Sequence, residues 1–334
     1  MPAEADGPDV VVLGASGYIG SAVLATVAAR PGWIRAIARR PAAVPIAARA
    51  DIEVRTADLT DRAALAEAVR GARAVVHLVA DINHGTGRSW RVTDDGSGER
   101  LNLGPVRDLV DVLSDRAGPP ATVVLTGSTT QVGPHDRLRI DGTEPDRPET
   151  AYDRQKLAAE RLLLAAHRRG ELRAVPLRLP TVFGASDAGG PFGAGVVAAM
   201  IGRALTGRPL TMWHDGSVVR DLLHVDDVAA AVGAVLARPE AVCGRPWLLG
   251  TGTGVPLRDV FVRIAALAAE VTGTLAVPVT AIEPPGHATP EDFRGVEVEA
   301  GAFRVATGWR PRIALDEGLR SALRRAQISL TEVR

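Results

Sequence analysis

The sequence predicts an α/β fold, a doubly wound parallel sheet with helices on both faces and a smaller C-terminal domain. Short apolar runs alternate with helical segments up to about residue 180, which is typical of strands buried on both faces of a parallel sheet. A glycine-rich turn, GASGYIG, connects the first apolar run to the first helical segment. The chain has 334 residues, of which 46% are hydrophobic, and it can therefore bury a large core.

Turn-forming residues separate the strands and helices of the first part, as Pro31-Gly32 does after the first helix. The predicted strands are Asp9–Leu13, Trp33–Ala38, Ile52–Arg55, Ala74–Val79, Thr122–Thr126 and Ala174–Leu179. The predicted helices are Gly17–Ala29, Arg62–Val69 and Tyr152–Arg169.

The regular alternation loosens after Pro180, where glycine and proline become frequent. We expect residues 1–180 to form the large domain, completed by about 217–250, and residues 181–216 and 251–334 to form a smaller cap that binds substrate. The elements expected there are the helices Val196–Leu205, Val225–Leu236, Leu257–Val271 and Leu315–Arg325 and the strands Leu210–Trp213 and Trp247–Gly250.

Composition excludes several classes of function. The formal net charge is zero, whereas a nucleic-acid-binding surface normally leaves a basic excess. No apolar run approaches the length of a membrane-spanning helix, and the acidic N-terminus lacks the features of a signal peptide. The single Cys243 has no partner for an internal disulfide. We therefore expect a cytoplasmic protein with no nucleic-acid or membrane partner.

Lys156 is the only lysine among 39 basic residues, and Tyr152, four positions earlier, is one of only two tyrosines. An arginine-rich composition has replaced lysine everywhere else. Arginine presents a wide planar fork, so a site that requires a compact ammonium group cannot accept it. The isolated lysine therefore indicates a chemical role.

The GASGYIG turn is a candidate dinucleotide-binding loop of a Rossmann domain. Small residues let the backbone approach a pyrophosphate, and the N-terminus of the following helix offers free N–H groups. The spacing GxxGxxG is the form seen in short-chain dehydrogenases. The predicted cofactor contacts in this loop are Gly14, Ser16, Gly17, Tyr18 and Ile19.

The end of the second strand indicates which dinucleotide binds. A carboxylate there would bind the ribose 2′-hydroxyl of NAD, but the strand ends in Arg39-Arg40. Guanidinium groups pair well with phosphate, so the cofactor is predicted to be NADPH/NADP. Asp58-Leu59 follows the third strand and is expected to contact the adenine ring.

Tyr152 and Lys156 lie four residues apart on one face of a predicted helix. A phenol with a pKa near 10 is a poor acid–base group at neutral pH. A neighbouring ammonium and a bound nicotinamide cation would both stabilise the phenolate. Ser128 follows an apolar strand and would hydrogen-bond the substrate oxygen, so these three residues are the predicted catalytic set.

These motifs together resemble an extended short-chain dehydrogenase/reductase of the NAD-dependent epimerase/dehydratase type over nearly the whole chain. The matching segments are GASGYIG, LTGSTTQVG, YDRQKLAAE, LRLPTVFG, RDLLHVDDVA and GWRPRIALDEGLR. The resemblance implies the triad of Ser128, Tyr152 and Lys156, and a homodimer formed by the helices Arg100–Leu113 and Tyr152–Arg169. It also implies that Arg220 grips the diphosphate of a nucleotide-sugar, and that Leu78, Ala80, Pro180 and Val182 border the nicotinamide.

The resemblance also narrows the reaction. Sugar-nucleotide dehydratases carry an Asp-Glu pair directly after the catalytic Ser or Thr, whereas this chain has Thr129 and Thr130. The sequence most resembles the 4-ketoreductases of NDP-4-keto-6-deoxyhexoses that complete deoxysugars for natural-product glycosides, and the substrate is expected to be dTDP-linked. Thr129, Thr130 and His84 would then contact substrate. An NDP-sugar 4-epimerase and a non-catalytic dinucleotide-binding regulator remain as alternatives.

The remaining polar residues have structural explanations. His77 lies in an apolar run and is expected in the core, and His224 is expected to pack rather than react. Asp226-Asp227 begin a helix and are expected to cap it. No metal site is predicted, because no His, Cys or Asp cluster has the spacing of metal ligands.

Overall fold

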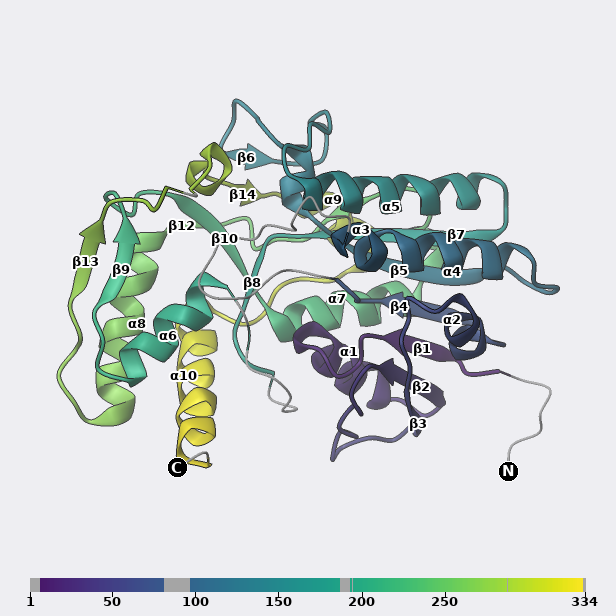
Figure 1. Cartoon of the computed structure of the whole chain (residues 1–334), viewed down its shortest axis with the longest axis horizontal. Coiled ribbons are helices and arrows are strands. Elements are labelled where there is room, and N and C mark those ends of the chain that lie inside the picture. The colour runs from purple at the N-terminus through teal and green to yellow at the C-terminus, as the bar shows by residue number, and fades with distance from the viewer. Residues whose placement is uncertain (1–6, 81–96, 187–192, 194, 287, 333–334) are drawn as a thin grey trace.

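Within the described residues, the large sheet holds seven parallel strands in the order β3-β2-β1-β4-β5-β7-β11 (Figure 1). The computed structural model describes residues 7–80, 97–186, 193, 195–286 and 288–332. The order reverses between β1 and β4, as it does in a doubly wound sheet. The strands are β1 (Val10–Leu13), β2 (Trp33–Ala38), β3 (Asp51–Thr56), β4 (Ala74–His77), β5 (Ala121–Ser128), β7 (Leu172–Leu179) and β11 (Trp247–Leu248).

Helices cover both faces of this sheet, because successive strand residues point to opposite sides. On β1, Val12 packs with α1 (Tyr18–Ala28) and α7 (Val225–Ala237). Its neighbour Val11 packs with α2 (Arg62–Val69), α4 (Gly104–Ser114) and α5 (Ala151–Arg168) on the other face. The predicted doubly wound α/β fold is confirmed.

A second lobe lies at one end of the sheet and has its own apolar core (Figure 1). The helices α6 (Val196–Leu205), α8 (Leu257–Thr272) and α10 (Leu315–Glu332) surround this core. Phe261 and Ile201 are fully buried in it. Beside these helices, β9 (Leu210–Trp213) pairs in parallel with β13 (Val279–Ile282).

Short strands connect the two lobes. In one small sheet, β10 (Val219–His224) pairs with β8 (Thr181–Phe183) and β12 (Gly254–Pro256). In another, β6 (Arg139–Ile140) pairs with β14 (Glu297–Val298). The remaining elements are α3 (Ser97–Asn102), α9 (Gly301–Thr307) and the short 3₁₀ helices η2 (Thr129–Val132), η3 (Pro239–Ala241) and η4 (Pro290–Phe293).

One predicted helix is wrong. The expected helix from Arg100 to Leu113 is two helices, α3 and α4, with a break at Leu103. Pro105 lies in the first turn of α4, where its missing N–H breaks no helical hydrogen bond, and it would interrupt a continuous helix.

Candidate active site

The glycine-rich turn places the start of α1 against the carboxyl ends of β1 and β4. Gly14 adopts a φ of +89°, which favours glycine, and a Cβ atom there would lie 3.2 Å from the carbonyl carbon of Leu78. A Cβ on Gly20 would lie 2.0 Å from the Gly14 carbonyl oxygen, so α1 can pack this closely only with glycine. Gly17 begins α1 without a side-chain cap, which leaves N–H groups for an anionic ligand.

Tyr18 has a second role in this turn. Its hydroxyl donates to the Gly184 carbonyl oxygen at 3.0 Å and thereby ties α1 to the segment after β8. Burial raises the pKa of this phenol, and the negative charge of Asp226 adds to the effect. Its side chain therefore holds structure together, while its backbone lies in the predicted cofactor loop.

Arg39 and Arg40 follow β2 and are both exposed. Asp58, after β3, accepts hydrogen bonds from the Thr60 backbone N–H at 3.0 Å and from its hydroxyl at 2.8 Å. These bonds lower the pKa of Asp58, and the positive charges of Arg39 and Arg100 lower it further. A 290 Å³ surface pocket begins beside this turn and is lined by Thr60, Glu99, Arg100, Gly104, Arg107 and Asp108.

Lys156 is buried behind Tyr152 on α5. Its Nζ atom donates to the Thr126 carbonyl oxygen at 2.9 Å and lies 5.8 Å from the centre of the Tyr152 ring. Burial lowers the pKa of Lys156 to about 8. Burial raises the pKa of Tyr152, and the negative charge of Asp153 raises it further. The ammonium is therefore the nearby charge that can favour a Tyr152 phenolate.

Ser128 ends β5 and is linked to α5 through two hydrogen bonds. Its Oγ lies 2.7 Å from Thr130 Oγ1, and Thr130 Oγ1 in turn donates to the Asp153 carboxylate. Because a carboxylate only accepts, the Thr130 proton is committed to Asp153, so Ser128 is the donor to Thr130. The structure thus brings Ser128, Tyr152 and Lys156 to one edge of the sheet, with Thr130 between the strand and the helix.

A sequence profile of the NAD dependent epimerase/dehydratase family matches residues 10–250. The chain belongs to this family. This finding confirms the resemblance inferred from the motifs, and it agrees with the strand order and with the site at the carboxyl edge of the sheet.

One relative of the chain is dTDP-L-rhamnose 4-epimerase from Burkholderia thailandensis. It is 26% identical, and the match covers 94% of this chain and 93% of the relative. Another is dTDP-6-deoxy-L-talose 4-dehydrogenase (NAD(P)(+)) from Kitasatospora kifunensis, 26% identical over 93% of each chain. A similar solved structure, MoeE5 in complex with UDP-glucose and NAD, is 26% identical, has a TM-score of 0.77 and covers 96% of this chain and 99% of its own.

Two acidic residues near the candidate site, Asp153 and Glu291, were not singled out from the sequence. Asp153 is buried and accepts from the hydroxyls of Thr130 and Thr150. Its position in the first turn of α5 is also typical of a helix-stabilising carboxylate, which concealed its contact with Thr130. Glu291, in η4, is half-buried. Burial, followed by repulsion from Asp153 and Asp292, raises the pKa of Glu291 to about 7.

Arg220 lies against η4 in this structure. Its Nη1 donates to the Arg294 carbonyl oxygen at 2.7 Å and its Nη2 to that of Asp292 at 2.8 Å. Burial lowers the pKa of this guanidinium. The predicted diphosphate contact therefore remains a prediction, and it would use the N–H groups that these bonds leave over.

His77 and His224 occupy structural positions. His77 is buried at the end of β4, and burial followed by the Lys156 charge lowers its pKa to about 3, so it is neutral at physiological pH. His224 is the residue that caps α7, where its ring accepts from the Asp226 N–H at 3.2 Å. The capping expected of Asp226-Asp227 is therefore wrong, and Asp227 instead accepts from the N–H groups of Arg312 and Ile313.

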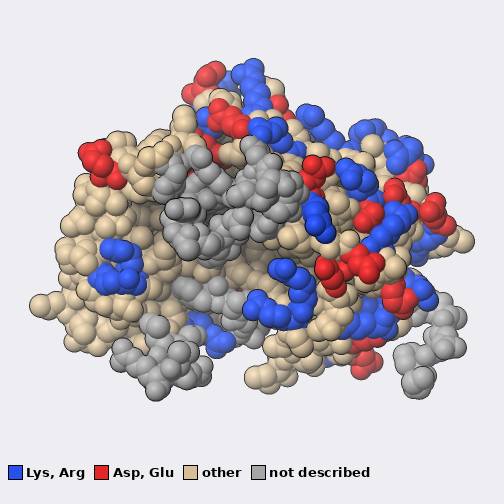
Figure 2. Space-filling view, in the orientation of Figure 1, with Lys and Arg blue, Asp and Glu red and all other residues tan. Residues whose placement is uncertain are grey.

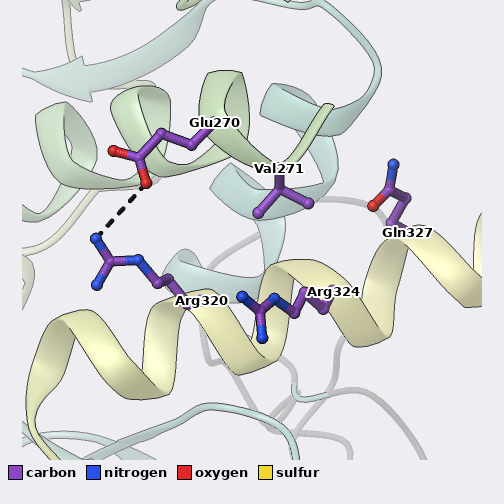
Figure 3. A pocket seen from close by; sticks show the side chains of 5 residues that line it. All are labelled: Glu270, Val271, Arg320, Arg324 and Gln327. Carbon is purple, nitrogen blue, oxygen red and sulfur yellow. Dashed lines mark ion pairs between the residues drawn. The ribbon is translucent and has the colours of Figure 1, made fainter. Parts of the chain in front are cut away.

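The other predicted contacts lie at the same edge of the sheet or outside the described residues. Leu78 and Ala80 follow β4, Pro180 lies between β7 and β8, and Val182 lies within β8. His84 lies outside the described residues. A 410 Å³ surface pocket between α8 and α10 contains none of the predicted site residues (Figure 3). It is lined by Glu270, Val271, Arg320, Arg324 and Gln327.

The face shown in Figure 2 carries no large patch of a single charge sign, because basic and acidic side chains are intermixed on it. Over the described part of the chain, no group of three or more His, Cys, Asp or Glu residues is arranged to hold a metal ion. Within the same residues, no helix is both long and apolar enough to cross a membrane.

Proposed function

We propose that this protein is an NADPH-dependent 4-ketoreductase that reduces the C4 ketone of an NDP-4-keto-6-deoxyhexose, with dTDP as the nucleotide. The observation that carries the proposal is the exposed Arg39-Arg40 pair at the end of β2, where a carboxylate would favour NAD. A preference for NADPH fits a reductant that is exchanged at each turnover. Thr129 and Thr130 replace the acid pair of a dehydratase, so elimination of water is not the reaction.

The residues fit a nicotinamide dinucleotide at both ends. The close approach at Gly14 and the uncapped start of α1 suit a pyrophosphate, and the buried Lys156 ammonium suits the ribose at the nicotinamide end. When bound, NADPH supplies the hydride that reduces the carbonyl carbon. Residues 1–180, completed by about 217–250, would hold this cofactor, and residues 181–216 and 251–334 would hold the sugar-nucleotide.

Tyr152 is the general acid in this reaction. It gives its phenolic proton to the oxygen of the C4 carbonyl, which becomes the product hydroxyl, and Lys156 stabilises the resulting phenolate. Ser128 turns its hydroxyl from Thr130 to the substrate oxygen. The Thr130 backbone N–H donates to Ser128 Oγ at 3.2 Å and continues to hold this serine oxygen in place. Solvent returns the proton to Tyr152 before the next turnover.

Relatives and site residues together support the substrate class. Two relatives that align with nearly the whole chain are named for dTDP-deoxysugars, and both names refer to chemistry at C4. Arg220 would bind the diphosphate, and Thr129, Thr130 and His84 would contact the sugar. The enzyme would act in the cytoplasm as a homodimer.

An NDP-sugar 4-epimerase is the second candidate, because one relative covering 94% of the chain carries that name. The two reactions differ in their consumption of cofactor. We expect incubation with a dTDP-4-keto-6-deoxyhexose to consume one NADPH for each C4 hydroxyl formed. Conversion of a dTDP-sugar into its C4 epimer without net NADPH consumption would establish the epimerase instead.

Tyr152→Phe is the first variant to test in this assay. It should fold and bind NADPH, and its kcat should fall by about 10²–10⁴-fold, as when a general acid is lost. Lys156→Arg should also lose most activity, because the wider guanidinium cannot fit behind the Tyr152 ring. Full activity of Lys156→Arg would contradict the role given to the ammonium group.

A further inference from the structure

A chain of buried side chains begins at the backbone N–H of Ser128. The Ser128 backbone N–H donates to Gln131 Oε1 at 2.7 Å, and Gln131 Nε2 donates to Glu160 Oε2 at 3.1 Å. Arg178 donates from Nε to Glu160 Oε2 at 2.9 Å and from Nη2 to Glu160 Oε1 at 2.6 Å. The chain therefore joins β5, η2, α5 and β7 in one hydrogen-bonded series.

Burial makes this series sensitive to any change of hydrogen-bonding group. Gln131 is fully buried, and Glu160 and Arg178 are 3% and 4% exposed. A buried polar group without a partner destabilises strongly, and a buried charge must be paired. Asp146 completes the pairing by accepting from Arg178 Nη1 at 2.6 Å.

Gly127 shows that the sequence makes room for this contact. A Cβ atom on Gly127 would lie 2.4 Å from Gln131 Oε1, closer than real Cβ contacts allow. Gly127 also stands directly opposite Arg178 in the pairing of β5 with β7. Any larger residue would therefore push the Gln131 amide away from the Ser128 N–H.

The direction of each hydrogen bond is fixed. A carboxylate only accepts and a guanidinium only donates, so Glu160 paired with Arg178 must accept from Gln131. The Gln131 amide is therefore oriented with its nitrogen toward Glu160 and its oxygen toward Ser128. The charge of Glu160 thus determines that Gln131 turns its oxygen atom toward the Ser128 N–H at the end of β5.

Glu160 also belongs to the helix that carries the catalytic pair. It lies four residues after Lys156 and eight after Tyr152, so all three share one face of α5. The contacts from Glu160 to Gln131 and Arg178 consequently fix α5 against the end of β5, where Ser128 lies.

From this geometry we infer that Gln131 and Glu160 are positioning residues that hold Ser128 in register with Tyr152. The charge of Glu160 orients the Gln131 amide, and the amide oxygen holds the Ser128 N–H. The inference rests on the proposed role of Ser128 as the ligand of the substrate oxygen. Neither residue touches substrate, so the effect should fall on kcat rather than on the KM for NADPH or sugar-nucleotide.

Three variants test the orientation of the amide. In Glu160→Gln the new amide NH₂ faces a donor in either orientation, Arg178 Nη2 or the Gln131 amide nitrogen, so the series is disrupted and kcat should fall about tenfold or more. In Gln131→Glu two adjacent carboxylates can share one proton, and that proton replaces the amide N–H. Its kcat should therefore rise toward the wild-type value as the pH is lowered. The double variant Gln131→Glu/Glu160→Gln restores a donor–acceptor pair and should recover part of the lost kcat at neutral pH.

Asp146→Asn is the matched control. It alters the same Arg178 cluster without changing the Gln131 amide, so it should lower the melting temperature with little change in kcat. An unchanged kcat in Glu160→Gln would overturn the inference. So would a loss of kcat that, in every variant including Asp146→Asn, simply follows the fall in melting temperature. Failure of the proposed function is distinguishable, because the wild-type protein would then turn over no NDP-4-keto sugar. If Ser128→Ala kept full activity, the role of Ser128 itself would be wrong.

Discussion

The Lys156 ammonium lies in a buried position between β5 and the Tyr152 ring, and this position affects the stability of the fold. Burial lowers its pKa from 10.5 to about 8, whereas in the unfolded chain the group keeps its ordinary value. Below pH 8 both states are protonated, and burying the charge reduces stability. As the pH rises from about 8 to 10.5, the folded protein loses the proton first and this penalty disappears.

Lys156→Met removes the buried charge and should therefore change the pH dependence of folding. The wild-type protein should gain about 3 kcal/mol relative to Lys156→Met between pH 7 and pH 10.5. Urea denaturation of both proteins without cofactor, at several pH values, measures this difference. Stability curves that stay parallel across the range would show that the ammonium is not desolvated.

Arg39 and Arg40 permit a residue-scale test of cofactor preference. Changing both to Ala should weaken NADPH binding by about tenfold to a hundredfold, since charge-assisted hydrogen bonds to a 2′-phosphate are lost. NADH binding should change little, because NADH lacks that phosphate. Fluorescence titration measures both affinities, and Arg30→Ala, an exposed arginine after α1, is the control. Equal losses for the two cofactors would remove the basis for assigning NADPH.

At the scale of elements, β10 is held between the two lobes by one buried carboxylate. Asp221 is fully buried and accepts from the N–H and hydroxyl of Thr251, from the Gly252 N–H and from the Val298 N–H. It therefore fixes the chain after β11 and the strand β14 against β10. The sequence presents it only as the residue after Arg220.

Asp221→Ala leaves these four donors without their acceptor and should lower the free energy of unfolding by about 3 kcal/mol or more. The urea midpoint measures the loss. Asp215→Ala, in which the exposed carboxylate of a surface turn is removed, should change the midpoint little. Similar midpoints for the two variants would show that the connection at Asp221 is dispensable.

At the scale of the whole molecule, the proposed homodimer can be tested directly. The helices α4 and α5 run side by side over one face of the sheet (Figure 1). Leu162 and Val112 on these helices are only partly buried in the single chain. We expect light scattering with size-exclusion chromatography to find a dimer. Leu162→Arg should give a folded monomer, because it places a charge in the apolar contact. A wild-type monomer would contradict the proposed homodimer.

Much of the fold and part of the site could be predicted from sequence, because their signals are local. Apolar runs identified the strands of the large sheet, and GASGYIG identified the turn into α1. The four-residue spacing of Tyr152 and Lys156 placed both on one helix face. The break between α3 and α4 was missed, although Pro105 was a local signal that could have shown it.

Signals within a few residues of one another were enough to predict the parallel sheet, the glycine-rich turn into α1 and the shared helix face of Tyr152 and Lys156. The surroundings of Ser128, by contrast, depend on the tertiary structure. Thr130 meets Asp153 from 23 residues away, and Gln131 meets Glu160 from 29. Asp153 and Glu160 look like ordinary polar residues of a helix when taken alone. Their roles arise because burial removes water and leaves the facing strand and turn as the partners that satisfy them.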